Sequence, residues 1–349
     1  MIRALVFDWG NTVMRDFPEY PGPMALWPHV EAIPGIAEAL AQLRPRYRLA
    51  LATNAASSGA DLVGQALARV GLEDYFTIFA ARDLGTCKPE PAFFARVLDG
   101  LGCAPQEAAM VGDDYRVDIV GAKAAGLRAI WFNPSAAPCP LLHPQHDAEV
   151  RTMAQLPAAV ADLHLPDLAE CLALLAEQEV PPRMLKHSQA VAAIAYALAI
   201  ALRQRGVPVD PLLAHRGGLL HDLDKVTSRR LNRAHGQLAA ELLRAKGQPE
   251  LAQIAQRHVI STPLDPAGQP TSWEEKLVFY VDKIVEDASV VSVAERLRAL
   301  AERYPEYGER MRICAPFILE LEAEICTALG TSPAALQATA REHLAAGVE

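Results

Sequence analysis

Short apolar runs alternate with segments of helical periodicity in the first half of the chain. The apolar runs predict strands at Ile2–Phe7, Arg48–Ala52, Phe76–Ala80, Ala108–Val111 and Arg128–Phe132. The spacing of apolar residues between them predicts helices near Gly35–Leu43, Gly59–Val70, Pro91–Leu101 and Val117–Ala125. This alternation is typical of a parallel sheet with helices on both faces. We therefore expect an α/β domain over residues 1–165.

The pattern changes in the second half of the chain. A Pro-rich stretch covers Asn133–Pro144, and a short helical segment is expected before Pro166. Beyond Leu168 the apolar residues recur at helical spacing, and no strand pattern appears. We expect an all-α domain over residues 166–349, with a core at about 168–300 and a helical extension at 301–349 that could also form a homodimer contact. The longest apolar run, Ala190–Leu202, is shorter than the roughly 20 residues that span a bilayer, so it predicts a buried helix.

The composition favours a folded, soluble protein over a disordered or nucleic-acid-binding one. The 349 residues are 51% hydrophobic and 21% charged, which favours two folded domains over disorder. The formal net charge is −9 and no long basic run is present, which argues against general nucleic-acid binding but not against a nucleotide substrate. The six cysteines form no CxxC pair, and a strand is predicted from residue 2, so we expect reduced thiols, no signal peptide and a soluble cytoplasmic protein without membrane association.

Polar residues follow the predicted strands of the first domain. They are Asp8 after the first strand, Thr53 and Asn54 after the second, Lys88 beyond the third, and Asp113, Asp114 and Asp118 after the fourth. Chemistry in an open parallel sheet gathers at the carboxyl ends of its strands, so these groups are expected to meet. Carboxylates suit Mg²⁺, a lysine neutralises phosphate, and an aspartate can attack phosphorus.

These blocks, "LVFDWGNTV", "TN", "GTCKPEPAFF" and "VGDDYRVDIVGAKAAG", occur in an order that resembles the haloacid dehalogenase-like phosphohydrolase superfamily. The resemblance covers about residues 1–165 and implies a Rossmann-like parallel sheet with a minimal cap. It implies that Asp8 is the nucleophile and a metal ligand. It implies phosphate binding by Thr53, Asn54 and Lys88, and Mg²⁺ binding by Asp113 with help from Asp114 and Asp118.

Gly10 departs from the family pattern. The family usually has a second aspartate there, which serves as general acid/base and is worth typically 10²–10⁴-fold in rate. Glycine keeps the backbone carbonyl that ligates the metal in the family, but it has no proton donor. We therefore expect a weakened or inactive site. The insert "RDFPEYPGPMALWPHVEAIPG" is either a small lid or a packed surface loop.

A second set of potential ligands lies in the helical half, within "RMLKHSQAVAAIA", "GLLHDLDK", "NRAHGQLAAELL", "IAQRHVIST" and "EEKLVFYVDKIVED". The set consists of His187, His221, Asp222, Lys225, His235, His258 and Asp282. Imidazole and carboxylate together suit Mn, Fe, Ni, Co or Zn. We interpret His215 as structural, because six residues before His221 it faces another side of a helix. The histidines of the linker, His143, His146 and His164, show no pattern.

The set resembles the HD-domain metal-dependent phosphohydrolases over about residues 168–300. The resemblance implies four core ligands, His187, His221, Asp222 and Asp282, with Asp222 and Lys225 as catalytic candidates. His235 and His258 resemble the extra histidines of bimetallic relatives, and one or two metals remain open. We expect a bifunctional phosphohydrolase for small phosphate esters or nucleotides, with the helical site the more active. The alternative is a nucleotide-binding or regulatory protein in which the first site is weak or inactive.

Overall fold

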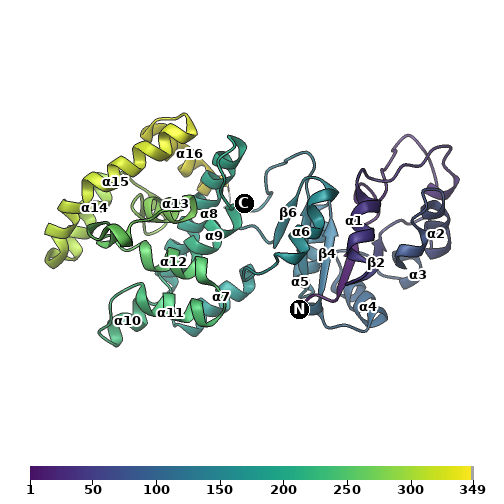
Figure 1. Ribbon diagram of the computed structural model, residues 1–349, viewed down its shortest axis with the longest axis horizontal. Helices are drawn as coiled ribbons and strands as arrows, with labels where there is room; N and C mark the ends of the chain where they lie inside the picture. The colour runs from purple at the N-terminus through teal and green to yellow at the C-terminus, as the bar shows by residue number, and fades with distance from the viewer. Residues whose placement is uncertain (347–349) are drawn as a thin grey trace. The chain divides into compact units, whose positions relative to one another are not determined.

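The computed structural model describes residues 1–346 (Figure 1). Its contacts divide the chain into two compact units. The first comprises Met1–Pro140 and Gln145–Leu163, and the second comprises Leu141–Pro144 and the chain from His164 onward. The last residues of the predicted helical extension, 347–349, lie outside the described part.

The first unit is built on a parallel sheet. Its strands are β1 (Ala4–Phe7), β2 (Arg48–Thr53), β3 (Thr77–Ala80), β4 (Ala108–Gly112), β5 (Arg128–Phe132) and β6 (Ala148–Val150). Their order is β3-β2-β1-β4-β5-β6, and every neighbouring pair is parallel. The predicted α/β fold is therefore confirmed. The sequence did not reveal β6, because three residues are too few to show a period.

Helices connect these strands. They are α1 (Ile36–Leu43), α2 (Ala60–Ala68), α3 (Ala81–Leu84), α4 (Pro91–Leu101), the π-helical turn η4 (Tyr115–Val120), α5 (Gly121–Ala124) and α6 (Leu156–Ala161). Short 3₁₀ turns lie at η1 (Met24–Leu26), η2 (Glu73–Tyr75), η3 (Pro105–Glu107) and η5 (Met153–Gln155). Each helix returns the chain so that the next strand again runs parallel, which brings the carboxyl ends of the strands to one edge.

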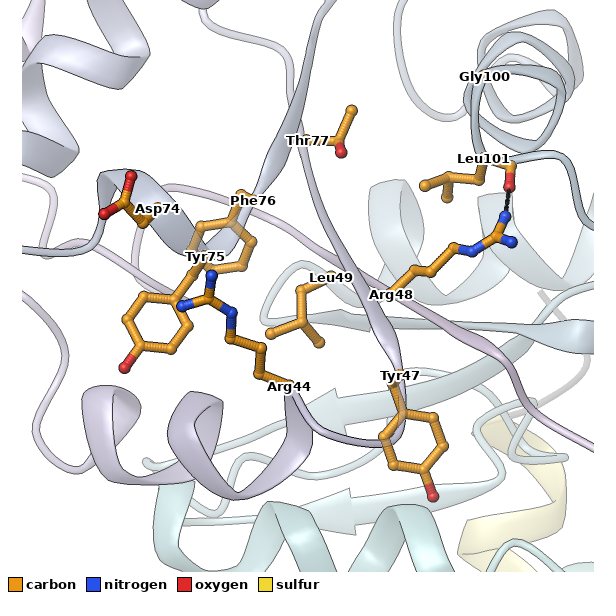
Figure 2. Close-up of a pocket in the computed structure, with 10 residues that line it drawn as sticks. All are labelled: Arg44, Tyr47, Arg48, Leu49, Asp74, Tyr75, Phe76, Thr77, Gly100 and Leu101. Carbon is orange, nitrogen blue, oxygen red and sulfur yellow. Dashed lines mark hydrogen bonds between the residues drawn. The ribbon is translucent and has the colours of Figure 1, made fainter.

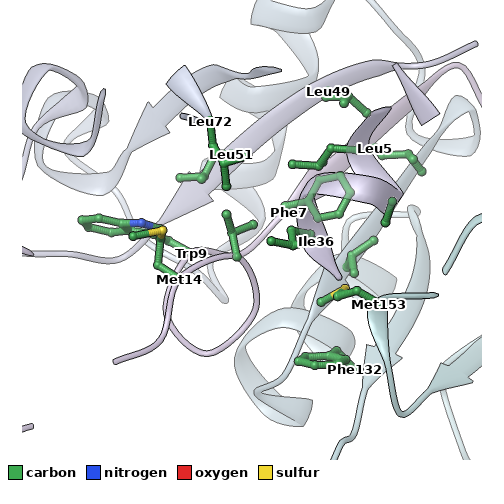
Figure 3. Close-up of a cluster of buried hydrophobic side chains, with 14 of the residues drawn as sticks. Leu5, Phe7, Trp9, Met14, Ile36, Leu49, Leu51, Leu72, Phe132 and Met153 are labelled. Carbon is green, nitrogen blue, oxygen red and sulfur yellow. The ribbon is translucent and has the colours of Figure 1, made fainter. Parts of the chain in front are cut away.

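The core of the first unit lies against β1, whose four residues are all fully buried. Leu5 and Phe7 alternate along the strand and share a hydrophobic cluster with Ile36 of α1 and Met153 (Figure 3). Burying one such side chain is worth about 1.5–3 kcal/mol, and Phe7→Ala would cost roughly 3–5 kcal/mol. This packing fixes the end of β1, and with it the backbone of Asp8.

The Pro-rich insert of the first unit folds as an aromatic cluster. The rings of Phe17, Tyr20 and Trp27 contact one another, with centroids 5.6 to 6.3 Å apart. The guanidinium of Arg69, at the end of α2, donates hydrogen bonds to the carbonyl oxygens of Ala25, Trp27 and Pro28. These bonds tie the insert to α2, which supports the packed-loop interpretation over a detached lid.

The second unit is helical, as predicted. Its helices are α7 (Leu168–Glu177), α8 (Pro182–Gln204), α9 (Pro211–Leu220), α10 (Lys225–Arg230), α11 (Gln237–Ala245), α12 (Pro249–Arg257), α13 (Trp273–Asp282), α14 (Val293–Arg303), α15 (Gly308–Leu329) and α16 (Pro333–Ala346). Turns η6 (Thr262–Leu264), η7 (Pro266–Gly268) and η8 (Pro305–Tyr307) join some of them. An antiparallel hairpin of β7 (Val285–Glu286) and β8 (Ser289–Val290) was not predicted, because two-residue strands show no pattern.

Small residues bring α8 and α9 together. A Cβ atom added to Gly218 would lie 2.7 Å from the Cα of Ala192, and one added to Gly217 would lie 2.7 Å from Cδ1 of Ile254. Only glycine therefore permits this approach of α9 to α8 and α12. The close crossing sets the distance between His187 on α8 and His221 at the end of α9.

Helix α8 is longer than the apolar run that predicted it. It has 23 residues, and its length and composition match those of a membrane span, with a mean window hydropathy of 1.4. Yet 67% of that window is buried inside the protein. Its Ala-rich surface packs in the hydrophobic cluster of the second unit. The helix therefore serves as the central core helix that the sequence indicated.

Candidate functional sites

Lys88 lies at the centre of the first candidate site. Its ammonium Nζ is 2.5 Å from Oδ1 of Asp8 and 2.7 Å from Oδ1 of Asp118. Burial alone would lower the pKa of Lys88, but the two carboxylates outweigh burial and raise the pKa above its ordinary value. Lys88 is therefore a buried cation. The parallel strands bring these three residues together from positions 80 and 30 apart in the chain.

Three carboxylates crowd at the same edge of the sheet. Oxygens of Asp8, Asp113 and Asp118 lie within 4.8 Å of one another. Burial, and then the charge of Asp8, raise the pKa of Asp113 to about 6, against the hydrogen bond from Thr12. Gly112 permits the crowding, because an added Cβ would lie 2.3 Å from Oδ2 of Asp118. An all-oxygen cluster of this kind fits Mg²⁺.

Two neighbours hold Asp113, and the sequence assigned neither of them a role. The Thr12 hydroxyl donates to Oδ1 of Asp113 over 3.1 Å. The indole Nε1–H of Trp131, at the end of β5, donates to the carbonyl oxygen of Asp113 over 3.0 Å. Thr12 stands four residues after Asp8, and this spacing was the available signal. Nothing in the sequence marked Trp131.

Two predicted site residues have other partners. The Asp114 carboxylate accepts hydrogen bonds from the backbone N–H groups of Arg116 and Val117, so it caps η4, and it is absent from the carboxylate cluster found in the described residues. The Asn54 amide pairs with the backbone N–H and carbonyl of Lys88, both at 2.8 Å. Asn54 thereby fixes the lysine, and Thr53 lies buried beside it at the end of β2.

Gly10 has open space around it. An added Cβ would meet no atom within 4 Å, so the fold itself does not exclude a side chain there. The hollow of about 390 Å³ in Figure 2 is unrelated to this site. It is lined by Arg48 and Thr77, which begin β2 and β3, whereas Asp8 follows the carboxyl end of β1. The hollow therefore lies at the opposite end of the strands.

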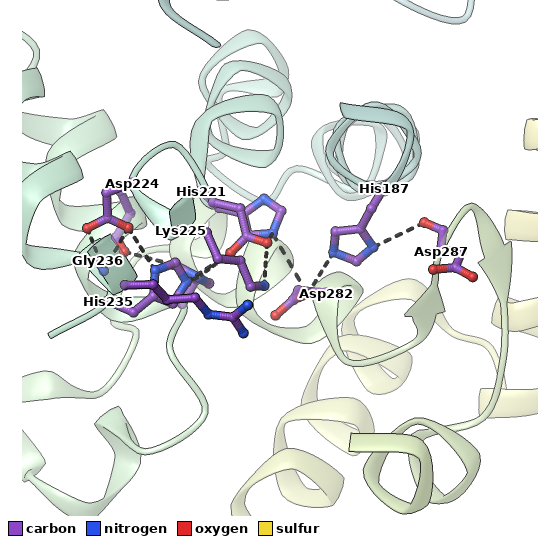
Figure 4. A network of polar contacts seen from close by, with 12 residues as sticks. His187, His221, Asp224, Lys225, His235, Gly236, Asp282 and Asp287 are labelled. Atoms are coloured by element: carbon purple, nitrogen blue, oxygen red, sulfur yellow. Dashed lines mark hydrogen bonds and ion pairs between the residues drawn. The ribbon is translucent and has the colours of Figure 1, made fainter. Parts of the chain in front are cut away.

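His187, His221 and Asp282 form one half of the second candidate site (Figure 4). Nε2 of His187 is 3.0 Å from Oδ1 of Asp282, and Nε2 of His221 is 3.8 Å from the same oxygen. Nε2 of His221 is also 3.6 Å from Oδ2 of Asp222. This nitrogen is fully buried and has no hydrogen-bond partner among the described residues. A buried lone pair that faces two carboxylates is an arrangement that fits a cation.

His235 and His258 form the other half with Asp222. Nε2 of His235 is 2.9 Å from Oδ1 of Asp222 and 3.1 Å from Nε2 of His258. Nε2 of His258 is 3.4 Å from the same oxygen of Asp222. Asp222 thus turns one carboxylate oxygen toward each half. The structure brings all six predicted ligands into one continuous cluster.

Three of the four site histidines are oriented alike. Nδ1 of His187 donates to the carbonyl of Asp287, Nδ1 of His221 to Gly218, and Nδ1 of His258 to Ala255. These bonds place the proton on Nδ1 and leave the Nε2 lone pairs directed at the cluster. The unpredicted β7–β8 hairpin supplies the Asp287 carbonyl (Figure 4).

The pKa values of two histidines in the second site are shifted in opposite directions. Burial lowers the pKa of His221 to about 3, so this ring is neutral. Burial would also lower the pKa of His235, but hydrogen bonds to Asp222 and Asp224 outweigh it and raise the pKa to about 9. His235 therefore carries a proton that faces Asp222 and the neutral ring of His258. In the metal-free protein a proton thus stands among donor atoms that fit a metal cation.

Two lysines flank the ligand carboxylates. Lys225 Nζ is 2.6 Å from Oδ2 of Asp222, and its side chain is 30% exposed, so it can also reach a bound ligand. Lys283 is buried, and its Nζ is 2.5 Å from Oδ2 of Asp282 and 2.9 Å from the carbonyl of His258. Lys283 thereby joins the two halves of the site. Its place directly after Asp282 was a signal that the sequence reading did not use.

A separate histidine pair lies outside this cluster. Nε2 of His215 is 3.0 Å from Nδ1 of His143, as expected for a structural residue. The neighbouring Arg216 is buried and donates to the carbonyl of Pro144 and to Nδ1 of His215. Residues 141–144 are therefore part of the packing of the second unit, which the predicted boundary at residue 166 does not include.

Two family models match the chain. The model of the haloacid dehalogenase-like hydrolases matches residues 10–126, and the model of the HD domain matches residues 184–300. The first match contains most of the carboxylate cluster, and the second contains all six ligands of the helical site. Each unit therefore has its own family relationship.

The similar curated proteins include phosphatases. The chain is 35% identical over 133 residues to a phosphoserine phosphatase of Thermus thermophilus, covering 38% of this chain and 48% of the relative. It is 34% identical over 131 residues to an uncharacterized protein of Methanocaldococcus jannaschii, covering 34% of this chain and 76% of that protein. A glyceraldehyde 3-phosphate phosphatase of Pyrococcus abyssi is 32% identical over 106 residues, with 30% and 43% covered. The chain thus spans less than half the length of these two phosphatases.

Solved structures align with about half of the chain. One is an uncharacterized protein from Listeria monocytogenes serotype 4b, with 27% identity and a TM-score of 0.41, covering 46% of this chain and 98% of that one. Another is a HAD phosphatase from Thermococcus onnurineus, with 24% identity and a TM-score of 0.39, covering 46% and 98%.

Proposed function

We propose that this chain, which is a fusion of a haloacid dehalogenase-like hydrolase domain with an HD domain, is a metal-dependent phosphohydrolase with two sites. The substrates are small phosphate esters or nucleotides, and the HD site is the more active. The observation that carries the proposal is the buried, unpartnered Nε2 of His221, which faces the carboxylates of Asp222 and Asp282. Leaving such a group unpaired is costly, so the arrangement favours a bound cation.

The donor set of the HD site fits one or two transition metals such as Mn, Fe, Ni, Co or Zn. The first would be held by His187, His221, Asp222 and Asp282, and the second by Asp222, His235 and His258. A bound cation supplies Lewis-acid polarisation of a phosphoryl oxygen. Lys225, partly exposed beside Asp222, is placed to neutralise charge that develops on the substrate.

The first site supports Mg²⁺-dependent phosphoryl transfer. Asp8, Asp113 and Asp118 would hold Mg²⁺, which supplies charge neutralisation when bound. The Asp8 carboxylate attacks phosphorus while Lys88 and Thr53 bind the phosphoryl oxygens. The bond from phosphorus to the leaving oxygen breaks, and that oxygen takes its proton from water, because Gly10 has none to give.

Gly10 also favours a second candidate function for the first domain. Without an acid at this position the domain could bind a phosphorylated ligand with little or no turnover, as a nucleotide-binding or regulatory domain. The intact Asp8–Lys88–Asp118 arrangement favours chemistry instead. Cleavage of a carbon–halogen bond is the less favoured reaction, because Lys88 and Asp113 suit a phosphoryl group.

Partners and location follow from charge and relatives. The phosphatases among the relatives support a small phosphorylated substrate. A net charge of −9 opposes general nucleic-acid binding. The burial of α8 supports a soluble, cytoplasmic protein without membrane association. The exposed Ile313 and Leu319 of α15 are consistent with a homodimer contact.

A substrate screen on the whole chain tests the proposal. Phosphate esters, nucleotides and dinucleotides are assayed with Mg²⁺ or Mn²⁺, using the wild type, Asp8→Asn, and His221→Ala combined with Asp222→Ala. Whole chains are required because residues 141–144 pack in the second unit. We expect each variant to lose a different group of substrates. Absence of hydrolysis by the wild type, or activity that neither variant changes, would contradict the proposal.

A further inference from the structure

His235 differs from the other site histidines in the group that contacts Nδ1, the ring nitrogen directed away from the cluster. The Nδ1 atoms of His187, His221 and His258 donate to neutral backbone carbonyls. Nδ1 of His235 instead lies 2.7 Å from Oδ1 of Asp224, a carboxylate (Figure 4). This single charged partner belongs to the half of the site that His235 forms with Asp222 and His258.

Asp224 is itself rigidly held. It is 2% exposed, and its carboxylate accepts hydrogen bonds from the backbone N–H groups of Gly236 at 2.9 Å and Ala239 at 3.1 Å. Both N–H groups lie at the start of α11, where the first N–H groups of a helix have no partner within the helix. Gly236 has a φ of +86°, and an added Cβ would lie 2.7 Å from the carbonyl of Ala255, so the turn requires glycine. The carboxylate therefore cannot follow a rotating ring.

We propose that Asp224 is a positioning residue for a second metal cation, acting through His235. The inference rests on the proposed metal-dependent function of the HD site. A fixed carboxylate on Nδ1 holds the imidazole in one orientation and increases the electron density at Nε2. Nε2 then becomes a stronger donor toward a cation shared with Asp222 and His258. Two metals, rather than one, follow from this arrangement.

The competing explanation is that Asp224 only caps α11. A cap stabilises the helix and has no effect on metal affinity once the protein is folded. Asp224→Asn separates the two roles, because it keeps the size and an accepting oxygen but removes the charge. Asp224→Ser keeps a capping oxygen for α11 but offers no carboxylate to His235. It serves as the second variant if the asparagine variant does not fold.

The experiment is a titration with Mn²⁺ of the metal-free whole chain carrying Asp113→Asn, so that the carboxylate cluster of the first domain takes up no metal; wild type here means this chain with its HD site unaltered. It is followed by calorimetry and by the spin-resonance signal of free Mn²⁺, with circular dichroism to verify folding. The wild type should bind two equivalents, and Asp224→Asn and Asp224→Ser should bind one of them about 10- to 100-fold more weakly. The control is Asp167→Asn, which makes the same change at the cap of α7, a helix without a candidate ligand, and should leave both equivalents unchanged.

A double-variant comparison makes the route explicit. In a His235→Gln background, Asp224→Asn should weaken Mn²⁺ binding no further, because the group through which it acts is gone. Unchanged affinity at both equivalents in folded Asp224→Asn would overturn the inference and leave a helix cap. One equivalent in the wild type would overturn it too, while metal-dependent function stands. No bound metal in the wild type would instead remove the proposed function itself.

Discussion

Both candidate sites contain several buried or partly buried carboxylates, and different groups neutralise their negative charge in each site. In the first site Lys88 contacts the carboxylates of Asp8 and Asp118 directly. In the second, a proton on His235 stands between Asp222 and the neutral ring of His258. A lysine side chain remains in the site when a metal cation binds, whereas a proton can be displaced by the cation. We propose that the helical site exchanges this proton for a metal when one binds, whereas the sheet site keeps its lysine beside the metal.

The difference extends to how firmly the groups are held. Carboxylate oxygens at the ends of separate strands present hard donors that suit Mg²⁺, an ion that is easily lost. The helical site adds imidazoles fixed through Nδ1, which suit tightly bound transition metals. The missing acid at Gly10 is expected to weaken the first site alone. The two sites should therefore differ in how tightly they retain a metal and in whether every catalytic group is present.

The largest expected effect comes from the nucleophile. Asp8→Asn should lower first-domain turnover by on the order of 10³-fold or more, because an amide cannot attack phosphorus as a carboxylate does. HD-site activity should be unchanged. Steady-state rates on the substrates of each site, with Mg²⁺ and with Mn²⁺, measure both. Equal losses at both sites would show that the two sites are not independent.

Asp114, which directly follows Asp113, provides a matched control. Asp113→Asn should abolish Mg²⁺-dependent turnover, because Asp113 lies in the carboxylate cluster, whereas Asp114→Asn should leave turnover and stability nearly unchanged, because Asp114 caps η4 and asparagine keeps an accepting oxygen. Thermal unfolding and rates are measured for both variants. If Asp114→Asn lost activity as completely as Asp113→Asn, the placement of Asp114 outside the cluster would be wrong.

The next effect concerns metal retention. His221→Ala combined with Asp222→Ala should remove the metal that survives purification, because Asp222 faces both halves of the HD site. The loss in affinity for the metal should exceed ~10- to 100-fold, the loss expected when only a hydrogen-bond partner of a metal ligand is removed. Metal content by plasma emission, before and after dialysis against a chelator, measures it. Retained metal in this variant would place the tight site elsewhere in the chain.

The sequence predicted the elements and ligands that repeat a pattern. The five longer strands of the first unit, and the helical second unit, were visible because apolar residues recur over four or more positions. Many of the residues proposed for the two sites were visible because they follow a strand end or lie in an apolar helical segment, although Lys88 and His235 lie in loops. For the first site, their meeting in space followed from the rule that parallel strands end at one edge.

The residues that position these groups could not be read in the same way. Trp131 holds Asp113, and the Asp287 carbonyl holds His187, through contacts that depend on tertiary packing. A backbone carbonyl is present at every position, so no residue type signals its use. Asp114 shows a role that the sequence did not predict. Its type and place suggested a metal ligand, and in the structure two N–H groups of η4 bind one oxygen of its carboxylate.

A smaller effect is expected from restoring the missing acid. Gly10→Asp should raise turnover of alkyl phosphates by much less than the ~10²–10⁴-fold that a fully positioned acid contributes, because their leaving oxygen needs a proton, and it should change aryl or acyl phosphates little. The space around Gly10 admits the side chain. Gly10→Asn, of equal size but without an ionisable proton, is the control. Equal gains from both variants, or the same gain on both substrate classes, would argue against the missing-acid explanation.

The smallest effect distinguishes the metal-facing histidines from the His143–His215 pair. Arg216 donates to Nδ1 of His215, so His215 carries its proton on Nε2 and donates it to Nδ1 of His143. A proton added to His143 would face that N–H. Burial, and then the charges of Arg216 and His343, lower the pKa of His143 to about 4, from an ordinary value of 6.5. His143 is thus a structural histidine that is stable only when neutral.

The sign of the pH effect follows from this lowered pKa. Between pH 6.5 and 4 the unfolded chain binds a proton at His143 and the folded chain does not, so stability falls as the pH drops through this window. The loss should be on the order of 1–3 kcal/mol. His143→Gln, whose amide oxygen can still accept from His215, should remove that part of the slope. Urea unfolding of the wild type and the variant at pH 7 and pH 4.5 measures the difference. Both proteins keep His221, whose pKa is also lowered by burial, so its contribution cancels in the comparison. Parallel losses in both proteins would show that the pair does not act as a buried neutral unit.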